Sequence, residues 1–223
     1  PTDVLETGYE ILFFWVARMI LMTRYALGEI PFHTVYLHGT VRDSQGRKMS
    51  KSLGNGIDPI AVAKTFGADA ARMALVVGTT PGMDSKISEE KIKGYKHFSN
   101  KIWNIARFVM IQNESQNYKN DKKHIAELKE LAKIVTTEME EFKFYLVAEK
   151  LYHYVWHTVG DVIVEEHKKG EVSTATLTEI LETSLILLHP FMPFVTEEIW
   201  QEIKQRAKGN LKHDLLMITA WPE

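Results

Sequence analysis

The sequence predicts an α/β portion followed by an all-α antiparallel helical bundle, so the fold is mostly helical overall. Three observations predict it: strand-like and helical segments alternate over residues 1–80, a turn-rich run (TPGMDSKI) follows at 80–87, and almost only helical signals appear over 88–223. Alternating strands and helices are typical of a parallel sheet that places its functional groups at the carboxyl ends of the strands. We place the domain boundary between 1–85 and 86–223.

Short strands and amphipathic helices alternate in the first part, as β-branched runs and helical apolar spacing show. A proline that follows an N-cap aspartate marks one helix start. In order, the predicted elements are a strand at 3–7 ending at Gly8, a helix at 9–26 ended by Gly28, a strand at 34–38, a helix from Asp58-Pro59 to Phe66, and a helix capped by Asp69 that runs to Val77.

The second part predicts helices separated by polar or proline-containing breaks. Apolar residues recur at three or four positions, as on the buried face of a bundle helix. The expected helices are 88–112, 122–141, 143–169, 174–188 and a last one that Thr196 caps and that ends near Arg206. We expect Trp103, Trp156, Trp200 and Phe191 in the core of this bundle.

Composition excludes several classes of protein. The 223 residues are 45% hydrophobic and 25% charged, with a net charge of −2, so any nucleic-acid site must be a local basic patch. No cysteine is present, which excludes disulfides and thiolate metal sites. The nine histidines show no metal-ligand spacing, and the longest apolar run (ILFFWVARMILM) contains Arg18 and is too short to span a bilayer. Because the chain starts at Pro1 rather than methionine, we expect it to be a piece of a longer protein.

The stretch GRKMSKSLGN at 46–55 concentrates positive charge on a flexible loop directly after a predicted strand. Its neighbourhood carries four cations and one anion: Arg42, Arg47, Lys48, Lys51 and Asp43. Glycines let such a backbone approach a ligand, and lysine ammoniums suit phosphate groups. A loop of this kind lowers the barrier to displacement of a polyphosphate. Charge runs are more often only solvated, so charge alone leaves both interpretations open.

The exact amino-acid sequence of this stretch resembles a motif of a known family. KMSKS at 48–52 resembles the second signature of class I aminoacyl-tRNA synthetases, and here it follows HG and precedes GN and DP as in that family. TGYEILFFWVARM at 7–19 resembles the valyl members, as do NKIWNIARFV at 100–109 and HPFMPFVTEEIW at 189–200. Glu10 departs from the valyl pattern, which usually has aspartate there, but the carboxylate is kept.

The resemblance implies a Rossmann-like catalytic domain, of which residues 1–85 are the C-terminal part, and an anticodon-binding domain at 86–223. It implies that Lys48, Ser50 and Lys51 take part in catalysis. It implies that the adenylate lies against Gly8, Glu10, His38, Gly39, Val41 and Lys51, and that Trp15 walls the amino-acid pocket. For Glu10 and Trp15, helix-dipole and core roles stay open as alternatives. Magnesium would accompany ATP, and we identify no protein ligand for it.

One face of the predicted helix at 88–112 carries a basic signal. Lys93, His97, Lys101 and Asn104 follow one another at three or four residues and lead to Arg107 and Phe108. Basic residues beside a stacking aromatic suit RNA loops, and the resemblance implies that this domain holds the tRNA anticodon. A solvated amphipathic face is the alternative for each of these residues.

The function that the resemblance implies is ATP-dependent activation of valine to valyl-adenylate and its transfer to tRNA(Val), by a cytoplasmic, monomeric enzyme that binds no membrane. We expect the chain alone to be inactive, because it lacks a HIGH-like first signature; valine-dependent ATP–pyrophosphate exchange by the isolated chain would refute this. Two alternatives stay open: a fragment of an isoleucyl- or leucyl-tRNA synthetase, and a non-catalytic tRNA-binding module.

Overall fold

The computed structural model describes residues 2–50, 52–113, 118–206 and 214–222. It divides the chain into two units, Pro1–Ile57 with Gly78–Ser88 and Asp58–Val77 with Glu89–Glu223. The first is the α/β unit and the second the helical unit. The chain therefore passes from the α/β unit into the helical unit, returns, and leaves again. The domain boundary drawn at residue 85 along the sequence stays a prediction.

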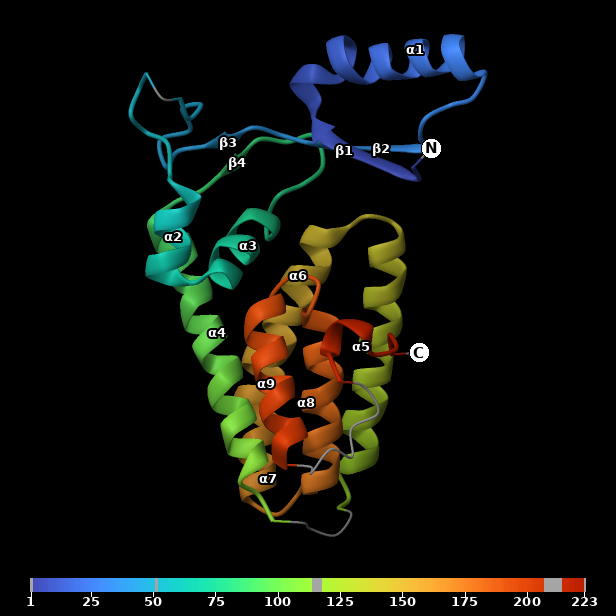
Figure 1. Cartoon of the computed structure of the whole chain (residues 1–223). Helices are drawn as coiled ribbons and strands as arrows, with labels where there is room; N and C mark the ends of the chain where they lie inside the picture. The colour runs from blue at the N-terminus through green and yellow to red at the C-terminus, as the bar shows by residue number, and fades with distance from the viewer. Residues whose placement is uncertain (1, 51, 114–117, 207–213, 223) are drawn as a thin grey trace. The chain divides into compact units, whose positions relative to one another are not determined.

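Two parallel strands organise the α/β unit, as the sequence predicts. β1 (Val4–Gly8) pairs with β2 (Thr34–His38), in a register that sets Val4 opposite Thr34 and Gly8 opposite His38. They lie side by side in blue in Figure 1. Because the strands are parallel and in register, Gly8 and His38 end at the same edge of the sheet.

The connection between these strands is helical as far as Leu27. It begins with a 3₁₀ turn (Tyr9–Ile11) and a π-helical turn (Leu12–Val16) and continues as α1 (Ala17–Leu27). Gly28 ends it at φ 75°, a conformation that glycine adopts without strain. The apolar residues of this helical segment are largely uncovered in the described chain, where Val16 is the only buried residue of 9–27.

A second parallel pair was not predicted. β3 (Val41–Arg42) pairs with β4 (Ser85–Lys86), which lies in the run expected to be only a turn. A strand of two residues has no periodicity that sequence could show. Gly82 donates its N–H to the carbonyl of Leu37 at 2.8 Å, so the returning segment follows β2 as well as β3.

The helical unit begins with α2 (Pro59–Phe66) and α3 (Ala68–Val76). The predicted start of α2 is confirmed, because the carboxylate of Asp58 accepts from the N–H of Ile60 at 2.9 Å. Both helices contact α4 (Glu89–Met110).

The antiparallel bundle follows with bounds close to those predicted. Its remaining helices are α5 (Asp121–Glu140), α6 (Phe144–His153), α7 (Val164–Lys168), α8 (Thr174–Leu188) and α9 (Pro193–Arg206), with a π-helical stretch (Tyr154–Ile163) between α6 and α7. They run alongside one another in Figure 1, and α8 contacts α4, α5, α6, α7 and α9. The fold class is confirmed.

The bundle core is apolar and closed. Phe98 of α4, Leu185 of α8 and Met192 before α9 are fully buried. Trp200 and Phe191 are buried as expected, and Trp103 and Trp156 pack partly buried against the same core. Burial of side chains of this size supplies most of the stability of such a bundle.

Two predicted caps were wrong. Asp69 does not cap α3, whose N-cap is Gly67, and Thr196 lies inside α9 rather than at its start. The buried carboxylate of Asp69 accepts instead from the N–H groups of Phe194 at 3.3 Å and Val195 at 2.7 Å. An acid in the first turn of one helix therefore caps another helix that lies 125 positions later in the chain.

We expect Asp69→Ala to lower the free energy of unfolding of the helical unit by about 2 kcal/mol, because it leaves two N-terminal amides of α9 without a partner. Denaturant unfolding followed by circular dichroism measures this loss. Asp69→Asn keeps an acceptor oxygen and should lose roughly half as much. Equal stability of the alanine variant and the unchanged chain would contradict the capping role.

Candidate functional site

A cavity of about 400 Å³ lies where β1 and β2 end. Its lining comes from the last residues of both strands and from the residues that follow them: Thr7, Gly8, Glu10, Ile11, His38, Gly39, Thr40 and Val41. Five residues predicted to bind the adenylate, namely Gly8, Glu10, His38, Gly39 and Val41, are among them. The parallel register brings these two stretches together, since it sets Gly8 opposite His38.

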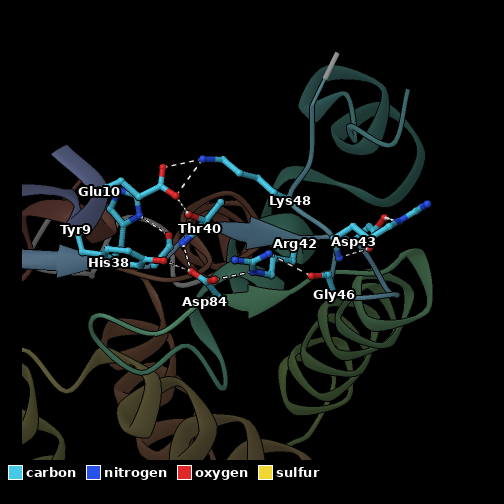
Figure 2. Close-up of polar contacts among 11 residues, drawn as sticks. Tyr9, Glu10, His38, Thr40, Arg42, Asp43, Gly46, Lys48 and Asp84 are labelled. Carbon is cyan, nitrogen blue, oxygen red and sulfur yellow. Dashed lines mark hydrogen bonds and ion pairs between the residues drawn. The ribbon is translucent and has the colours of Figure 1, made fainter. Parts of the chain in front are cut away.

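Glu10 is the acidic group of this cavity. Its carboxylate accepts from the ammonium of Lys48 at 2.7 and 2.9 Å and from the hydroxyl of Thr40 at 3.1 Å. The hydrogen bond from Lys48, followed by that from Thr40, lowers the pKa of Glu10, so this group is a carboxylate at neutral pH. Figure 2 shows Lys48 reaching across to Glu10, which joins the lysine loop to the cavity wall.

The imidazole ring of His38 is held by the backbone of the next residue and by a nearby acid. Its Nδ1 lies 2.8 Å from the carbonyl oxygen of Gly39, and its Nε2 lies 3.4 Å from a carboxylate oxygen of Glu6. The ring contacts Gly8, where a Cβ would meet its Cε1 at 3.4 Å. About half of the side chain stays exposed at the cavity. Its position therefore suits contact with a flat ligand ring.

Gly39 is required by a close approach of two backbones. A Cβ at this position would lie 2.0 Å from the carbonyl oxygen of Met83, in the segment that returns from the helical unit. Real Cβ atoms do not come that close to a backbone atom, so only glycine fits here. The returning segment can therefore lie directly behind the cavity wall.

Asp84 fixes that returning segment to the wall. Its carboxylate accepts from the N–H of Thr40 at 2.7 Å, from Nε of Arg42 at 2.5 Å and from the hydroxyl of Tyr9 at 3.0 Å (Figure 2). The N–H of Thr40, followed by Arg42, lowers the pKa of Asp84. Sequence reasoning missed Asp84 and Thr40, because Asp84 was read as turn chemistry and nothing in the sequence pairs it with residue 40.

The structure describes the lysine loop at 46–55 except for Lys51. Lys48 lies on Glu10, and the hydroxyl of Ser50 accepts from the N–H of Leu53 at 3.3 Å and lies 3.1 Å from that of Ser52. Arg42 donates to the carbonyl of Gly46 at 3.2 Å, which ties the start of the loop to β3. Lys51, predicted to contact the phosphates, lies outside the described residues. The loop thus reaches the cavity wall through the ammonium of Lys48, and the hydroxyl of Ser50 is held within the loop.

Trp15 lies apart from this cavity lining. It is in the π-helical turn and 53% exposed, one turn beyond Ile11, which does line the cavity. Its neighbours Phe13 and Phe14 are also exposed, at 78% and 68%. The role of Trp15 in an amino-acid pocket stays a prediction.

The basic face of α4 lies in the helical unit. Lys93, His97, Asn104 and Arg107 are exposed along it. Lys101 differs, because its ammonium donates to a carboxylate oxygen of Asp161 at 2.8 Å and lies 5.5 Å from the centre of the Trp156 ring. The four exposed residues share one face because they follow one another at three, four or seven positions, as on successive turns of a helix.

Phe108 is less accessible than a stacking platform would be. It is partly buried against the bundle core, its ring lies edge-on to His167, and the ammonium of Lys168 lies 5.5 Å from its centre. Assignment of these α4 residues to tRNA binding stays a prediction.

Neither a metal cluster nor a membrane span is found where the structure describes the chain. No group of three or more histidine or acidic side chains there could hold a metal ion. Among the same residues, no helix is both long and apolar enough to cross a bilayer.

The cavity at the ends of β1 and β2 combines the carboxylate of Glu10, the ammonium of Lys48 and backbone groups at a sheet edge. These groups together suit a nucleotide.

Comparison with known proteins defines the class. Residues 1–88 match the family "tRNA synthetases class I (I, L, M and V)", and residues 121–223 match the family "Anticodon-binding domain of tRNA ligase". Residues 1–88 therefore belong to the class I tRNA synthetase family, and residues 121–223 to the anticodon-binding domain family.

Within that class, the chain is similar along its whole length to valine–tRNA ligases. It is 41% identical to that of Clostridium tetani over 242 aligned positions, and 42% identical to that of Listeria innocua. Each alignment takes in 100% of this chain and 27% of the relative, so the chain spans about a quarter of the length of the relatives it matches.

Solved structures of the class share the fold. A LeuRS–tRNA–LeuAMS ternary complex from Agrobacterium radiobacter superposes with a TM-score of 0.76 at 25% identity, over 99% of this chain and 28% of that one. Methionyl-tRNA synthetase of Mycobacterium tuberculosis, in complex with methionyl-adenylate, superposes with a TM-score of 0.75 at 21% identity, over 96% of this chain and 48% of that one. The second likeness shows the fold alone.

Proposed function

We propose that the chain is part of a cytoplasmic valine–tRNA ligase, in which it supplies the lysine-loop half of the valine-activating site and the domain that binds the anticodon. The full protein would join valine to ATP, giving valyl-adenylate and pyrophosphate, and would then transfer valine to the terminal ribose of tRNA(Val). The whole-length similarity to valine–tRNA ligases supports the choice of valine.

The observation that carries this proposal is the cavity at the ends of β1 and β2, with Glu10 in its wall and Lys48 above it. A carboxylate at this position can accept hydrogen bonds from ribose hydroxyls. An ammonium on a loop at the same edge can neutralise the charge that develops on a leaving pyrophosphate. The two groups are close enough to contact one nucleotide. A ribose that takes up the Glu10 carboxylate releases Lys48 for the phosphates.

In this proposal magnesium arrives with ATP. The acids nearest the cavity are already occupied, Glu10 by Lys48 and Thr40 and Asp84 by Arg42, Thr40 and Tyr9. The metal would therefore be held by the phosphates and water, which suits its usual coordination. It would share the neutralisation of phosphate charge with the loop.

The helical unit would hold the anticodon stem and loop through the exposed basic face of α4. Lys93 and Arg107 supply the charge that attracts phosphates, and His97 shares their exposed face. Asn104 supplies amide groups that can read a base edge. We assign Lys101 a supporting role there, because its charge is paired with Asp161.

The rival functions are an isoleucyl or leucyl specificity and a tRNA-binding module without catalysis. One apolar surface argues against the module. The stretch from Ile11 to Leu27 exposes Phe13, Leu21 and Tyr25 at 78%, 70% and 90%. Exposed apolar surfaces of this size mark a contact with another part of the protein or with a partner. Further catalytic-domain chain would cover it.

The test is amino-acid-dependent ATP–pyrophosphate exchange by the full-length protein that contains this chain. Exchange that valine drives at least a hundredfold better than isoleucine or leucine would support the proposal, since the missing or added methylene of the side chain is discriminated by about 10- to 200-fold. Exchange driven best by another amino acid would replace valine, and exchange with none would favour the module. The isolated chain is the matched control and should show no exchange.

A further inference from the structure

Asp43 lies at the base of the lysine loop, directly after β3, and is a buried residue at 8% exposure. Its Oδ1 accepts from the backbone N–H of Gln45 at 3.0 Å and of Arg47 at 2.8 Å. Its Oδ2 accepts from Nε of Arg47 at 2.8 Å and from the amide of Asn55 at 2.9 Å. This one carboxylate therefore joins the two ends of the loop.

Asn55 binds the loop from its other end. We call Asp43 and Asn55 together the bracket of the lysine loop. Its Oδ1 accepts from the backbone N–H of Ser50 at 2.9 Å. Its Nδ2 donates to the backbone carbonyl of Lys48 at 3.3 Å as well as to Asp43. An amide can do this because it carries donors and an acceptor on one rigid group. The backbone on both sides of Met49 is thus held by a single side chain.

We propose that Asp43 and Asn55 are positioning residues that hold the backbone of Lys48 and Ser50 in the geometry needed to neutralise the phosphates of the nucleotide. This inference rests on the proposed function. Neither side chain lines the cavity, so neither contacts the ligand there. They act through the backbone that carries the ammonium and the hydroxyl.

A cation stabilises a developing charge best when its position is fixed before the reaction. Gly46 and Gly54, at φ 80° and 61° near the two ends of the loop, restrict its backbone less than other residues would. The fixed hydrogen bonds of Asn55 reduce that freedom next to Lys48. The bond from Asn55 is also the main reason why the pKa of Asp43 is lowered to about 2, so the bracket is charged and intact at neutral pH.

The sharpest variant is Asn55→Asp, which has the same shape. It removes both amide donor bonds and sets a second carboxylate against Asp43. The matched control is Gln45→Glu, which adds the same charge to the same loop at an exposed side chain. The paired variant combines Asp43→Asn with Asn55→Asp. It sets an amide donor at residue 43 opposite a carboxylate acceptor at residue 55, and it removes the repulsion between two carboxylates.

In the full-length protein, we expect Asn55→Asp to lower the kcat of valine-dependent exchange about tenfold to a hundredfold while the KM for valine changes less than twofold. Gln45→Glu should stay within twofold of the unchanged protein in both constants. The paired variant should recover at least threefold over Asn55→Asp. If Asn55→Asp behaves like Gln45→Glu, or changes only the KM for valine, the positioning role is overturned.

A second readout separates this inference from the proposed function. In the present chain, repulsion by Asp43 should move the new carboxylate of residue 55 away from the N–H of Ser50, so hydrogen exchange of that amide should be at least tenfold faster in Asn55→Asp than in Gln45→Glu. If the unchanged full-length protein shows no valine-dependent exchange, the proposed function fails, and equal Ser50 rates in the two variants would then overturn the bracket itself. Faster Ser50 exchange in Asn55→Asp together with normal catalysis would contradict the positioning role alone.

Discussion

Replacing Gly39 with alanine is expected to open the cavity wall of the α/β unit. The new Cβ would lie 2.0 Å from the carbonyl oxygen of Met83 and 2.5 Å from the backbone nitrogen of Asp84. Backbone atoms cannot give way as the end of a side chain can, so the returning segment must separate from the wall. Overpacking of this severity costs about 3 kcal/mol.

Hydrogen exchange of two amides measures this effect. Thr40 donates its N–H to Asp84, and Ser85 donates its N–H to Thr40, so both amides lie at the contact that the alanine breaks. We expect both to exchange about a hundredfold faster in Gly39→Ala, since each factor of ten corresponds to about 1.4 kcal/mol. Amides of α4 should be unchanged.

The control is Gly56→Ala. Beyond Gly56 and its two chain neighbours, no atom of the described residues lies within 4 Å of the position that its Cβ would take, and its φ is not in the left-handed region. This variant should exchange at Thr40 and Ser85 like the unchanged chain. Equal rates for Gly39→Ala and Gly56→Ala would show that the two backbones do not approach as closely as described.

Lys48→Ala is expected to reduce valine-dependent ATP–pyrophosphate exchange by the full-length protein about a hundredfold, the usual effect of removing one preorganised charge from a transition state. Stability should change little, because Lys48 and Glu10 form an exposed ion pair on the surface of the α/β unit. The loss should fall mainly on kcat, since the ammonium stabilises charge that develops during the reaction.

Lys86→Ala is the matched control for this change. Lys86 is an exposed lysine of β4 in the same unit, and it is outside the cavity lining. It should keep exchange within twofold of the unchanged protein. A similar loss in both variants would mean that the unit responds to total charge rather than to an aimed ammonium.

The sequence predicted the elements that carry a local signal. The β-branched run at 34–38, the Asp58-Pro59 start of α2 and the left-handed Gly28 each contain their own reason within a few residues, and the structure confirms them. Five of the residues expected around the nucleotide line one cavity for the same reason, since they end or follow strands that a parallel sheet brings together.

The sequence could not predict contacts that form where the chain returns to an earlier element. β4 and the Asp84 contacts exist because residues 78–88 come back to β2 and β3 after the excursion through α2 and α3. The cap that Asp69 provides to α9 joins residues that lie 126 positions apart in the chain. Nothing within a few residues of Asp69 or Asp84 indicates such partners, so each was assigned the local role that its neighbours suggest.

The central claim is tested most directly by binding of this chain to tRNA(Val), beside the same tRNA with a changed anticodon, at two salt concentrations. We predict tighter binding to the unchanged tRNA, and weaker binding to both at the higher salt, with the logarithm of the affinity falling by about 0.7–0.9 per phosphate contact for each tenfold rise in salt. Equal affinity for both tRNAs at each salt concentration would contradict the account, because the helical unit would then offer only a basic surface and read no anticodon.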